Sequence, residues 1–379
     1  MAFEQCRTLR SRNVPIILLG RHDETDPSKL SGLKGLSRTL RQEWPDADIS
    51  TIDVSVQSSP GDIAGAALAN MQDATLVGQR LTAETLSNTS LPLPVGRSPT
   101  AGGSWLVTGG GRGVTAACAI ELARQIKHGT MILAGRSELA AWPERLPVDD
   151  DLKSLRGALI ERAKSNGERP RPAEIDKLAR GVLASQEIRS TLDALADEGI
   201  SAQYVQLDLA NGQQVGAQVK HLVSVYGPIT GLVHGAGVLA DRLASQKTKA
   251  DMAHVFAPKV DGLLHLLGAL DLAALQYCGL FSSAAAVFGN PGQCDYAMAN
   301  AWLNAVAQHL HDTQAQLAIK SFCWGPWAGG MVDETLATHF QDRGIPLISL
   351  RDGAEVFARY LLYGDREAVT LLVGDRWQS

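Results

Sequence analysis

Long apolar runs are missing from this chain of 379 residues, and so is any excess of positive charge. No apolar run reaches the roughly 18 residues that cross a bilayer. The first residues lack the basic and then apolar order of a signal peptide. A net charge of −5 gives the chain as a whole no basic footprint for nucleic acid. We therefore expect neither a membrane nor a nucleic acid as a partner.

Cysteine is scarce, and its few residues are scattered over the whole length. Their odd number excludes a simple disulfide scaffold, and no pair has the spacing of zinc ligands. Such thiols are typical of a reducing compartment, so we expect a cytoplasmic protein without a bound metal. The five residues are Cys6, Cys118, Cys278, Cys294 and Cys323.

The composition is that of a folded chain. Hydrophobic residues make up 45% and charged residues 20%, which supports a sizeable core and argues against disorder. At about 100–200 residues per domain, the length suggests two domains or one large one.

The first part of the chain alternates strand and helix patterns. Residues 14–20 and 49–54 are apolar and predict strands, while 31–41 and 62–71 have helical spacing. The loop that follows the first strand, residues 20–24, lacks the glycines that a pyrophosphate site needs. We expect residues 1–95 to form a Rossmann-like unit that binds no cofactor.

A linker and a second α/β part follow. The stretch 88–104 is rich in Ser, Pro, Gly and Thr, and we place the linker at 96–103. From residue 104 onward, helical patterns separate successive apolar runs, which predicts a doubly wound parallel sheet with helices on both faces over 104–379. The expected strands lie at 105–108, 131–134, 203–207, 231–233, 278–283 and 319–323.

The connection between the second and third of these strands is unusually long. Residues 151–165 and 173–198 both have helical periodicity, and Gly and Pro residues at 167–172 separate them. This pattern predicts a helical hairpin inserted at about 138–199. It is either a surface decoration or a docking surface for a neighbouring domain or carrier.

A glycine-rich turn opens the second part. It lies between an expected strand and an expected helix, which is the context of a dinucleotide fingerprint. Glycines let the backbone approach a pyrophosphate, and the helix N-terminus adds free N–H groups. The turn consists of Thr108, Gly109, Gly110, Gly111, Arg112 and Gly113, followed by Val114.

The end of the next strand indicates which dinucleotide binds. An NAD site wants an acidic residue there for the ribose 2′-hydroxyl, but this strand ends in Gly135, Arg136 and Ser137. The Arg136 guanidinium suits a 2′-phosphate, and Arg112 is a second cation nearby. We therefore expect NADPH.

A third pattern resembles a catalytic site. Ser283 ends an apolar strand, Tyr296 follows thirteen positions later, and Asn300 lies one helical turn beyond. With the glycine turn, these residues make the chain similar to the ketoreductase domain of type I polyketide synthases, in the short-chain dehydrogenase/reductase superfamily. The matching motifs are TGGGRG (108–113), GRS (135–137), LDL (207–209), HGAG (234–237), PKVDG (258–262), FSSAAAVFGNPGQCDYAMAN (281–300) and WGPW (324–327).

The resemblance extends to the first part and to one branch of the family. LKGLSRTLRQEWP (33–45) is similar to the signature of the family's truncated structural subdomain. The residues that follow WGPW, Gly329-Gly330-Met331-Val332, together with the long insertion and the segment 290–293, resemble ketoreductases of polyunsaturated fatty acid synthases.

The resemblance implies a mechanism. Tyr296 would donate a proton to a β-keto oxygen, Ser283 would orient that oxygen, and Asn300 would complete the proton relay. Lys259 would take the place of the lysine that ordinary superfamily members carry at position 300. Its ammonium would hold the nicotinamide ribose and lower the pKa of Tyr296 toward neutrality.

Further cofactor contacts follow from the same resemblance. They are Asp208 at the adenine, Leu209 beside it, and Gly235, Ala236 and Gly237 near the ribose. Asp208 could instead be a simple turn residue, and we read His234 as structural rather than catalytic.

The resemblance also concerns stereochemistry and substrate. Asp241 matches an acid found in ketoreductases that give a D (usually 3R) hydroxyl, although Ala240 replaces its usual acidic neighbour. Phe288 stands where the opposite class has Trp. Substrates of the family are acyl chains on an acyl carrier protein, supplied by other synthase domains. Met331, Phe340 and the WGPW turn are either a lid over the acyl chain or ordinary core.

Three functions therefore compete. The first is an NADPH-dependent β-ketoacyl reductase within polyketide or polyunsaturated fatty acid synthesis. The second is an inactive scaffold or docking module, against which the intact Ser283, Tyr296, Lys259 and Asn300 argue. The third is a free-standing alcohol dehydrogenase, against which the cofactor-less first part argues.

Overall fold

The computed structural model describes most of the chain. It covers residues 2–10, 14–23, 25–69, 71–94, 103–143, 151–330 and 344–374, together with 338, 340 and 342. The predicted linker at 96–103 lies outside the described residues except for Gly103.

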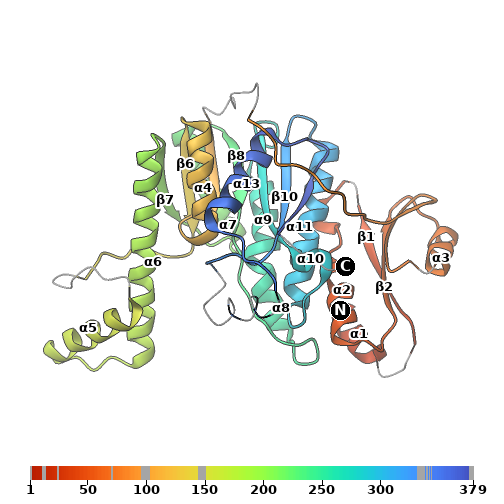
Figure 1. Cartoon of the computed structure of the whole chain (residues 1–379), viewed down its shortest axis with the longest axis horizontal. Coiled ribbons are helices and arrows are strands. Elements are labelled where there is room, and N and C mark those ends of the chain that lie inside the picture. The colour runs from red at the N-terminus through yellow and green to blue at the C-terminus, as the bar shows by residue number, and fades with distance from the viewer. Residues whose placement is uncertain are drawn as a thin grey trace.

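A sheet of seven parallel strands forms the centre of the molecule (Figure 1). Its order is β11-β10-β9-β8-β5-β6-β7, so the chain reverses direction across the sheet between β5 and β8. Ligands of doubly wound sheets bind at such a reversal, beyond the carboxyl ends of the strands. The strands are β5 (Ser104–Thr108), β6 (Thr130–Gly135), β7 (Ser201–Gln206), β8 (Ile229–His234), β9 (Tyr277–Ser283), β10 (Ala318–Trp324) and β11 (Thr370–Val373).

Helices cover both faces of this sheet, as the sequence predicts. One face packs against α4 (Gly113–Ile126), α6 (Pro172–Asp197) and α13 (Leu350–Tyr363), around buried Trp105 and Phe357. The other face carries a second core of aliphatic side chains. Its helices are α7 (Gly212–Tyr226), α8 (Lys249–Phe256), α9 (Gly262–Ala269) and α11 (Cys294–Thr313). The predicted α/β fold is confirmed.

A smaller sheet stands beside the large one (Figure 1). Its strands β1 (Ile16–His22), β2 (Ile49–Ser55) and β3 (Asp73–Val77) are parallel, and β4 (Arg80–Thr82) closes the edge antiparallel. Three α-helices accompany this sheet among the described residues, and Pro60 and a capping box at Ser59 start the third. They are α1 (Ala2–Arg10), α2 (Leu33–Glu43) and α3 (Pro60–Leu68).

Helix α2 joins the small sheet to the large one. Its apolar residues Leu36 and Leu40 are fully buried. Gly35 lies so close to α11 that a Cβ there would collide with the Ala297 carbonyl, so the two helix backbones approach without a side chain between them.

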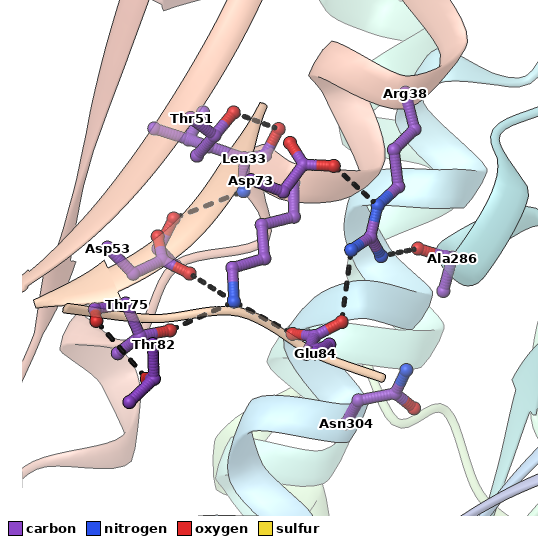
Figure 2. A network of polar contacts seen from close by, with 12 residues as sticks. Leu33, Arg38, Thr51, Asp53, Asp73, Thr75, Thr82, Glu84, Ala286 and Asn304 are labelled. Carbon is purple, nitrogen blue, oxygen red and sulfur yellow. Dashed lines mark hydrogen bonds and ion pairs between the residues drawn. The ribbon is translucent and has the colours of Figure 1, made fainter. Parts of the chain in front are cut away.

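Polar contacts strengthen the same junction, as Figure 2 shows. The partly buried Arg38 guanidinium donates to Asp73 Oδ2 at 2.9 Å, to Glu84 Oε2 at 3.0 Å and to the Ala286 carbonyl at 2.7 Å. Ala286 belongs to α10 (Ala284–Phe288), the short helix after β9. The small sheet is thereby tied to the segment that follows Ser283.

The predicted helical insertion is present. Helix α5 (Leu152–Ser165) and the first half of α6 extend away from the sheet and pack on each other around Leu155, Leu159 and Val182 (Figure 1). The second half of α6 returns to the large sheet, where Leu195 is buried in its core.

The described helices and the cysteines bear on the membrane and disulfide predictions made from the sequence. Among the described helices, none combines the length and apolarity that crossing a bilayer requires. All five cysteines are buried and free.

Candidate active site

A cavity of about 980 Å³ opens at the carboxyl ends of the central strands. The glycine turn and the loops after β6 and β7 form one part of its wall, and the segments after β8 and β9 form another. The cavity thus lies at the reversal point of the sheet, where ligands of this fold bind.

The glycine turn fits an anion. Gly109 and Gly113 have φ of 72° and 62°, values that favour glycine. They direct the chain from β5 into α4, whose N-terminal residues face the cavity. Free N–H groups and the helix dipole at this end suit a pyrophosphate, so the residues present fit a nicotinamide dinucleotide.

Helix α6 supports this turn from behind, a role that the sequence did not reveal. The Thr191 hydroxyl donates to the Gly111 carbonyl at 3.0 Å. A Cβ on Gly111 would lie 2.9 Å from the Ile188 side chain. Glu187, Ile188 and Tyr204 also line the cavity.

Most of the predicted cofactor contacts meet in this cavity. Thr108 and Gly110 do not line it: the Thr108 hydroxyl contacts His234, and Gly110 faces the Val107 side chain. Those on the cavity wall are Gly109, Gly111, Arg112, Gly113, Val114, Arg136, Ser137, Asp208, Leu209, Gly235, Ala236 and Gly237.

Two exposed cations lie where the glycine turn and the end of β6 form the cavity wall. Arg112 and Arg136 both line it, and neither forms an ion pair with a described residue. Asp208 is exposed nearby and accepts a hydrogen bond from the backbone of Ala210 at 3.1 Å. This end of the cavity therefore offers two guanidinium groups to an anionic ligand.

The predicted catalytic residues Ser283 and Tyr296 line the same cavity. Ser283 ends β9 and caps α10, its Oγ accepting from the Ala285 backbone at 3.2 Å. Tyr296 is the third residue of α11, whose N-terminal end borders the cavity. Strand β9 and helix α11 thus bring a hydroxyl and a phenol to one wall.

Lys259 joins them from a π-helical turn, Ala257–Asp261, between α8 and α9. Such turns are frequent at functional sites. The buried Lys259 Nζ donates to the Phe281 carbonyl at 2.6 Å and lies 5.5 Å from the centroid of the Tyr296 ring. Burial lowers the pKa of Lys259 to about 7.

The expected effect of Lys259 on Tyr296 is wrong for this structure. Burial raises the pKa of Tyr296, while the neighbouring Asn300 and Ser283 side chains lower it in part. The lysine lies over the aromatic ring, and its own pKa is depressed, so loss of solvation dominates at the phenol.

Asn300 is fully buried one turn beyond Tyr296 and does not line the cavity. Its Nδ2 donates to the Tyr296 backbone carbonyl at 2.8 Å, and its Oδ1 finds no hydrogen-bond partner among the described residues. In this geometry Asn300 braces the tyrosine turn from inside the helix.

His234 connects three segments beneath the site. Its Nδ1 lies 2.9 Å from the Thr108 hydroxyl and its Nε2 lies 3.0 Å from the Lys259 carbonyl. Complete burial lowers the pKa of His234 to about 3, so the ring is neutral at pH 7. These contacts agree with a structural role.

The predicted stereocontrol residue Asp241 is exposed and lies off the cavity wall. Its Oδ2 accepts from Gln293 Nε2 at 2.9 Å, and Gln293 does line the cavity. Phe288 lines it too. Asp241 thus contacts the site through Gln293.

The predicted lid falls partly within the described residues. Trp324, Gly325, Pro326, Trp327 and Phe340 line the cavity, whereas Met331 is outside the described residues. Among the residues that the structure describes, no cluster of His, Cys, Asp and Glu could hold a metal.

Comparisons with known proteins identify the family of the chain. Residues 103–329 match the family model of the KR domain. A polyunsaturated fatty acid synthase polypeptide of Thraustochytrium sp. is 35% identical over 361 residues, which is 91% of this chain and 13% of the relative. Polyketide synthase PksL of Bacillus subtilis is 30% identical over 347 residues, which is 88% of this chain and 7% of the relative. The chain therefore spans a small part of the length of these relatives.

Solved structures have the same fold. A-type ketoreductases from a modular polyketide synthase match 98% of this chain, and the match covers 71% of that one, with a TM-score of 0.75 and 22% identity. A ketoreductase domain from the bacillaene assembly line matches with a TM-score of 0.70 and 21% identity, over 98% of this chain and 81% of that one. On the family model, this chain belongs to the ketoreductase domains of polyketide synthases, in the short-chain dehydrogenase/reductase superfamily.

Proposed function

We propose that the chain reduces a carrier-protein-bound β-ketoacyl thioester to the β-hydroxyacyl thioester with NADPH. The observation that carries this proposal is the convergence of Tyr296, Ser283 and Lys259 on a cavity that also holds the glycine turn and Arg136. An acid, a hydrogen-bond donor and a dinucleotide cradle are the parts that ketone reduction requires.

NADPH, when bound, supplies the hydride that adds to the ketone carbon. Gly109, Gly111 and Gly113 would hold its pyrophosphate at the start of α4. Gly235 and Gly237, which line the cavity, would leave room for the ribose near the nicotinamide, and Gly237 lies beside Lys259.

Arg136 is the main argument for NADPH over NADH. It is exposed at the end of β6, on the cavity wall and next to Ser137. A guanidinium forms charge-assisted pairs with a phosphate, and Arg112 would reinforce it.

Side chains of the protein would supply the proton that the ketone oxygen takes up. Tyr296 would donate it to the ketone oxygen, and Ser283 would donate a hydrogen bond that orients the same oxygen. The raised pKa of Tyr296 keeps the phenol protonated before the reaction, as a proton donor must be. Lys259 would stabilise the phenolate that forms, and Asn300 would hold the tyrosine turn in place.

The similarity to multidomain synthases suggests the setting. In the named relatives this region is one part of a much longer chain, so an acyl carrier protein and other synthase domains are the expected partners. We propose residues 1–95 as a structural subdomain without a cofactor, residues 96–103 as the linker and residues 104–379 as the catalytic part. Asp241, through Gln293, supports a D (3R) product.

The test is NADPH oxidation with a β-ketoacyl pantetheine thioester, followed by chiral analysis of the product. We expect turnover with NADPH far above that with NADH, and the D enantiomer. Cofactor binding without turnover would favour an inactive scaffold. Equal or better turnover of simple ketones lacking the thioester would favour a free-standing alcohol dehydrogenase.

A further inference from the structure

A completely buried ion pair lies directly beside the catalytic tyrosine. Lys247 Nζ is 2.8 Å from Asp295 Oδ1, and the two side chains are 0% and 1% exposed. Asp295 is the residue before Tyr296, and Lys247 lies in the loop between β8 and α8, two residues before α8 begins. Neither side chain lines the cavity.

The Lys247 ammonium joins the loop between β8 and α8 to the segment that leads into α11. Besides Asp295, it donates to the Ala240 carbonyl at 2.7 Å and to the Gly292 carbonyl at 3.1 Å. An ammonium has three N–H donors, so each one has a protein acceptor here. Ala240 lies between Leu239 of the cavity wall and Asp241, and Gly292 precedes Gln293 of that wall.

Asp295 links Lys247 to the backbone of the tyrosine. The same Oδ1 that meets Lys247 accepts from the Tyr296 backbone N–H at 2.9 Å. The position of the Tyr296 main chain is therefore fixed to the loop that carries Ala240 and Asp241.

Glu43, in helix α2 beside the small sheet, binds backbone N–H groups of the same two segments. Its carboxylate accepts from the Gly292 N–H at 2.8 Å and from the Ala244 N–H at 2.7 Å. The Gly292 peptide is thus held on its oxygen by Lys247 and on its nitrogen by Glu43.

Stability alone does not explain the pair. Charges lose their hydration when buried, and apolar residues of similar volume often serve stability equally well. Asp295 Oδ2 is buried without a hydrogen-bond partner among the described residues, and burial raises the pKa of Asp295 more than the bond to Lys247 lowers it. The pair therefore provides hydrogen bonds of fixed direction rather than a net gain in folding free energy.

We propose that Lys247 and Asp295 are positioning residues that fix Tyr296 relative to the Leu239–Asp241 segment and thereby set both turnover and the face of the ketone that is reduced. This proposal rests on the ketone reduction proposed above. A displacement of about 1 Å between reacting groups can reduce a rate by 100-fold, so the distance between these segments matters for chemistry.

The test is the double variant Lys247→Met/Asp295→Leu, which removes both charges and leaves neither one unpaired. Circular dichroism and gel filtration report folding, while kcat, KM and the enantiomer ratio report positioning. We expect a folded protein whose kcat falls by about 10- to 100-fold, with an eroded enantiomer ratio and an NADPH affinity within about twofold of wild type.

Lys320→Met is the matched control. Lys320 is also buried, at 1% exposure, and its Nζ is held by the carbonyls of Asp365, Arg366 and Ala368, away from the cavity. We expect this variant to lose stability and to keep the wild-type kcat and enantiomer ratio. An equal loss of kcat in Lys320→Met would overturn the proposal, because the effect would then be a general loss of stability.

A folded double variant with wild-type kcat and enantiomer ratio would also overturn it. Should the double variant not fold, Asp295→Asn decides, since it keeps the volume and one acceptor oxygen. A kcat lowered by about threefold together with a lower enantiomer ratio supports the proposal, and wild-type values contradict it. A wild-type protein that binds NADPH and reduces no β-ketoacyl thioester would refute the proposed function itself.

Discussion

Each sheet of this chain begins with a parallel strand, a loop and a helix: β5 and α4 in the large sheet, β1 and α2 in the small one. In the large sheet the loop holds three glycines and Arg112. Gly109 and the first helix residue, Gly113, have positive φ, and the helix opens on a cavity. In the small sheet the loop holds the buried carboxylate of Asp23, which accepts from the Thr25 backbone at 3.0 Å and from Arg21 at 2.7 Å. An aspartate there repels the phosphate that the glycine turn would bind.

The two sheets share the α/β arrangement and differ in the loop after the first strand, so this loop decides whether the strand–loop–helix unit suits a phosphate. Helix α2 of the small sheet contacts segments of the large one instead: Arg38 donates to the Ala286 carbonyl, and Glu43 accepts from the Gly292 N–H. Substitutions in the two sheets should therefore separate turnover from stability.

Tyr296→Phe should have the largest effect and should act on turnover alone. Loss of a general acid lowers rates by about 10²- to 10⁴-fold, so we expect kcat to fall by about 10³-fold. NADPH affinity, measured by fluorescence titration, should stay unchanged, because the phenol hydroxyl is the only group removed. A kcat within tenfold of wild type would disprove the assigned role.

Arg136→Ala tests whether the large sheet binds the 2′-phosphate of NADPH. A charge-assisted pair contributes about 1.5–3 kcal/mol, so the Kd for NADPH should rise by about 10- to 100-fold while that for NADH changes little. Arg124→Ala is the control, since Arg124 is an exposed arginine at the end of α4 that does not line the cavity. An equal loss of affinity for both cofactors would contradict the assignment of the 2′-phosphate.

Arg38→Ala should show the reverse pattern in the small sheet. It leaves Asp73 and the Ala286 carbonyl without this partner, and we expect the free energy of unfolding to fall by about 2–3 kcal/mol. Denaturant unfolding measures the loss, with exposed Arg80→Ala of the same sheet as control. A change in NADPH affinity with unchanged stability would break the comparison.

His234→Gln sharpens the comparison, because it is a change in the large sheet that should act on stability. The histidine pKa falls from 6.5 to about 3 through burial, so the unfolded chain binds more protons than the folded one between these values. The stability from this group is complete above pH 6.5 and is lost as the pH falls toward 3, by at most about 1.4 kcal/mol per pH unit. Unfolding of wild type should therefore depend more steeply on pH from 6 to 5 than unfolding of the variant, and parallel curves would contradict a neutral buried ring.

The sequence predicted what local spacing determines. The glycine turn, Arg136 and the Ser283–Tyr296 spacing depend on residues close together in the chain, and the resemblance singled out Lys259, which lines the same cavity. Strands β3, β4 and β11, of three to five residues each, were not expected.

Contacts between distant segments were not predictable in this way. Lys247 meets Asp295 across 48 positions, and Thr191 meets Gly111 across 80. The pKa of Tyr296 depends on burial, which spacing does not reveal, and a lysine expected at the phenol lies over the ring instead.

The most direct measurement follows a deuterium label from NADPH, deuterated at C4 of the nicotinamide, to a β-ketoacyl pantetheine thioester, with wild type beside Tyr296→Phe. The account predicts one deuterium on the carbinol carbon of the wild-type product, on a single enantiomer, and almost none from the variant. Labelled NADPH that binds but transfers no deuterium to the thioester would contradict it.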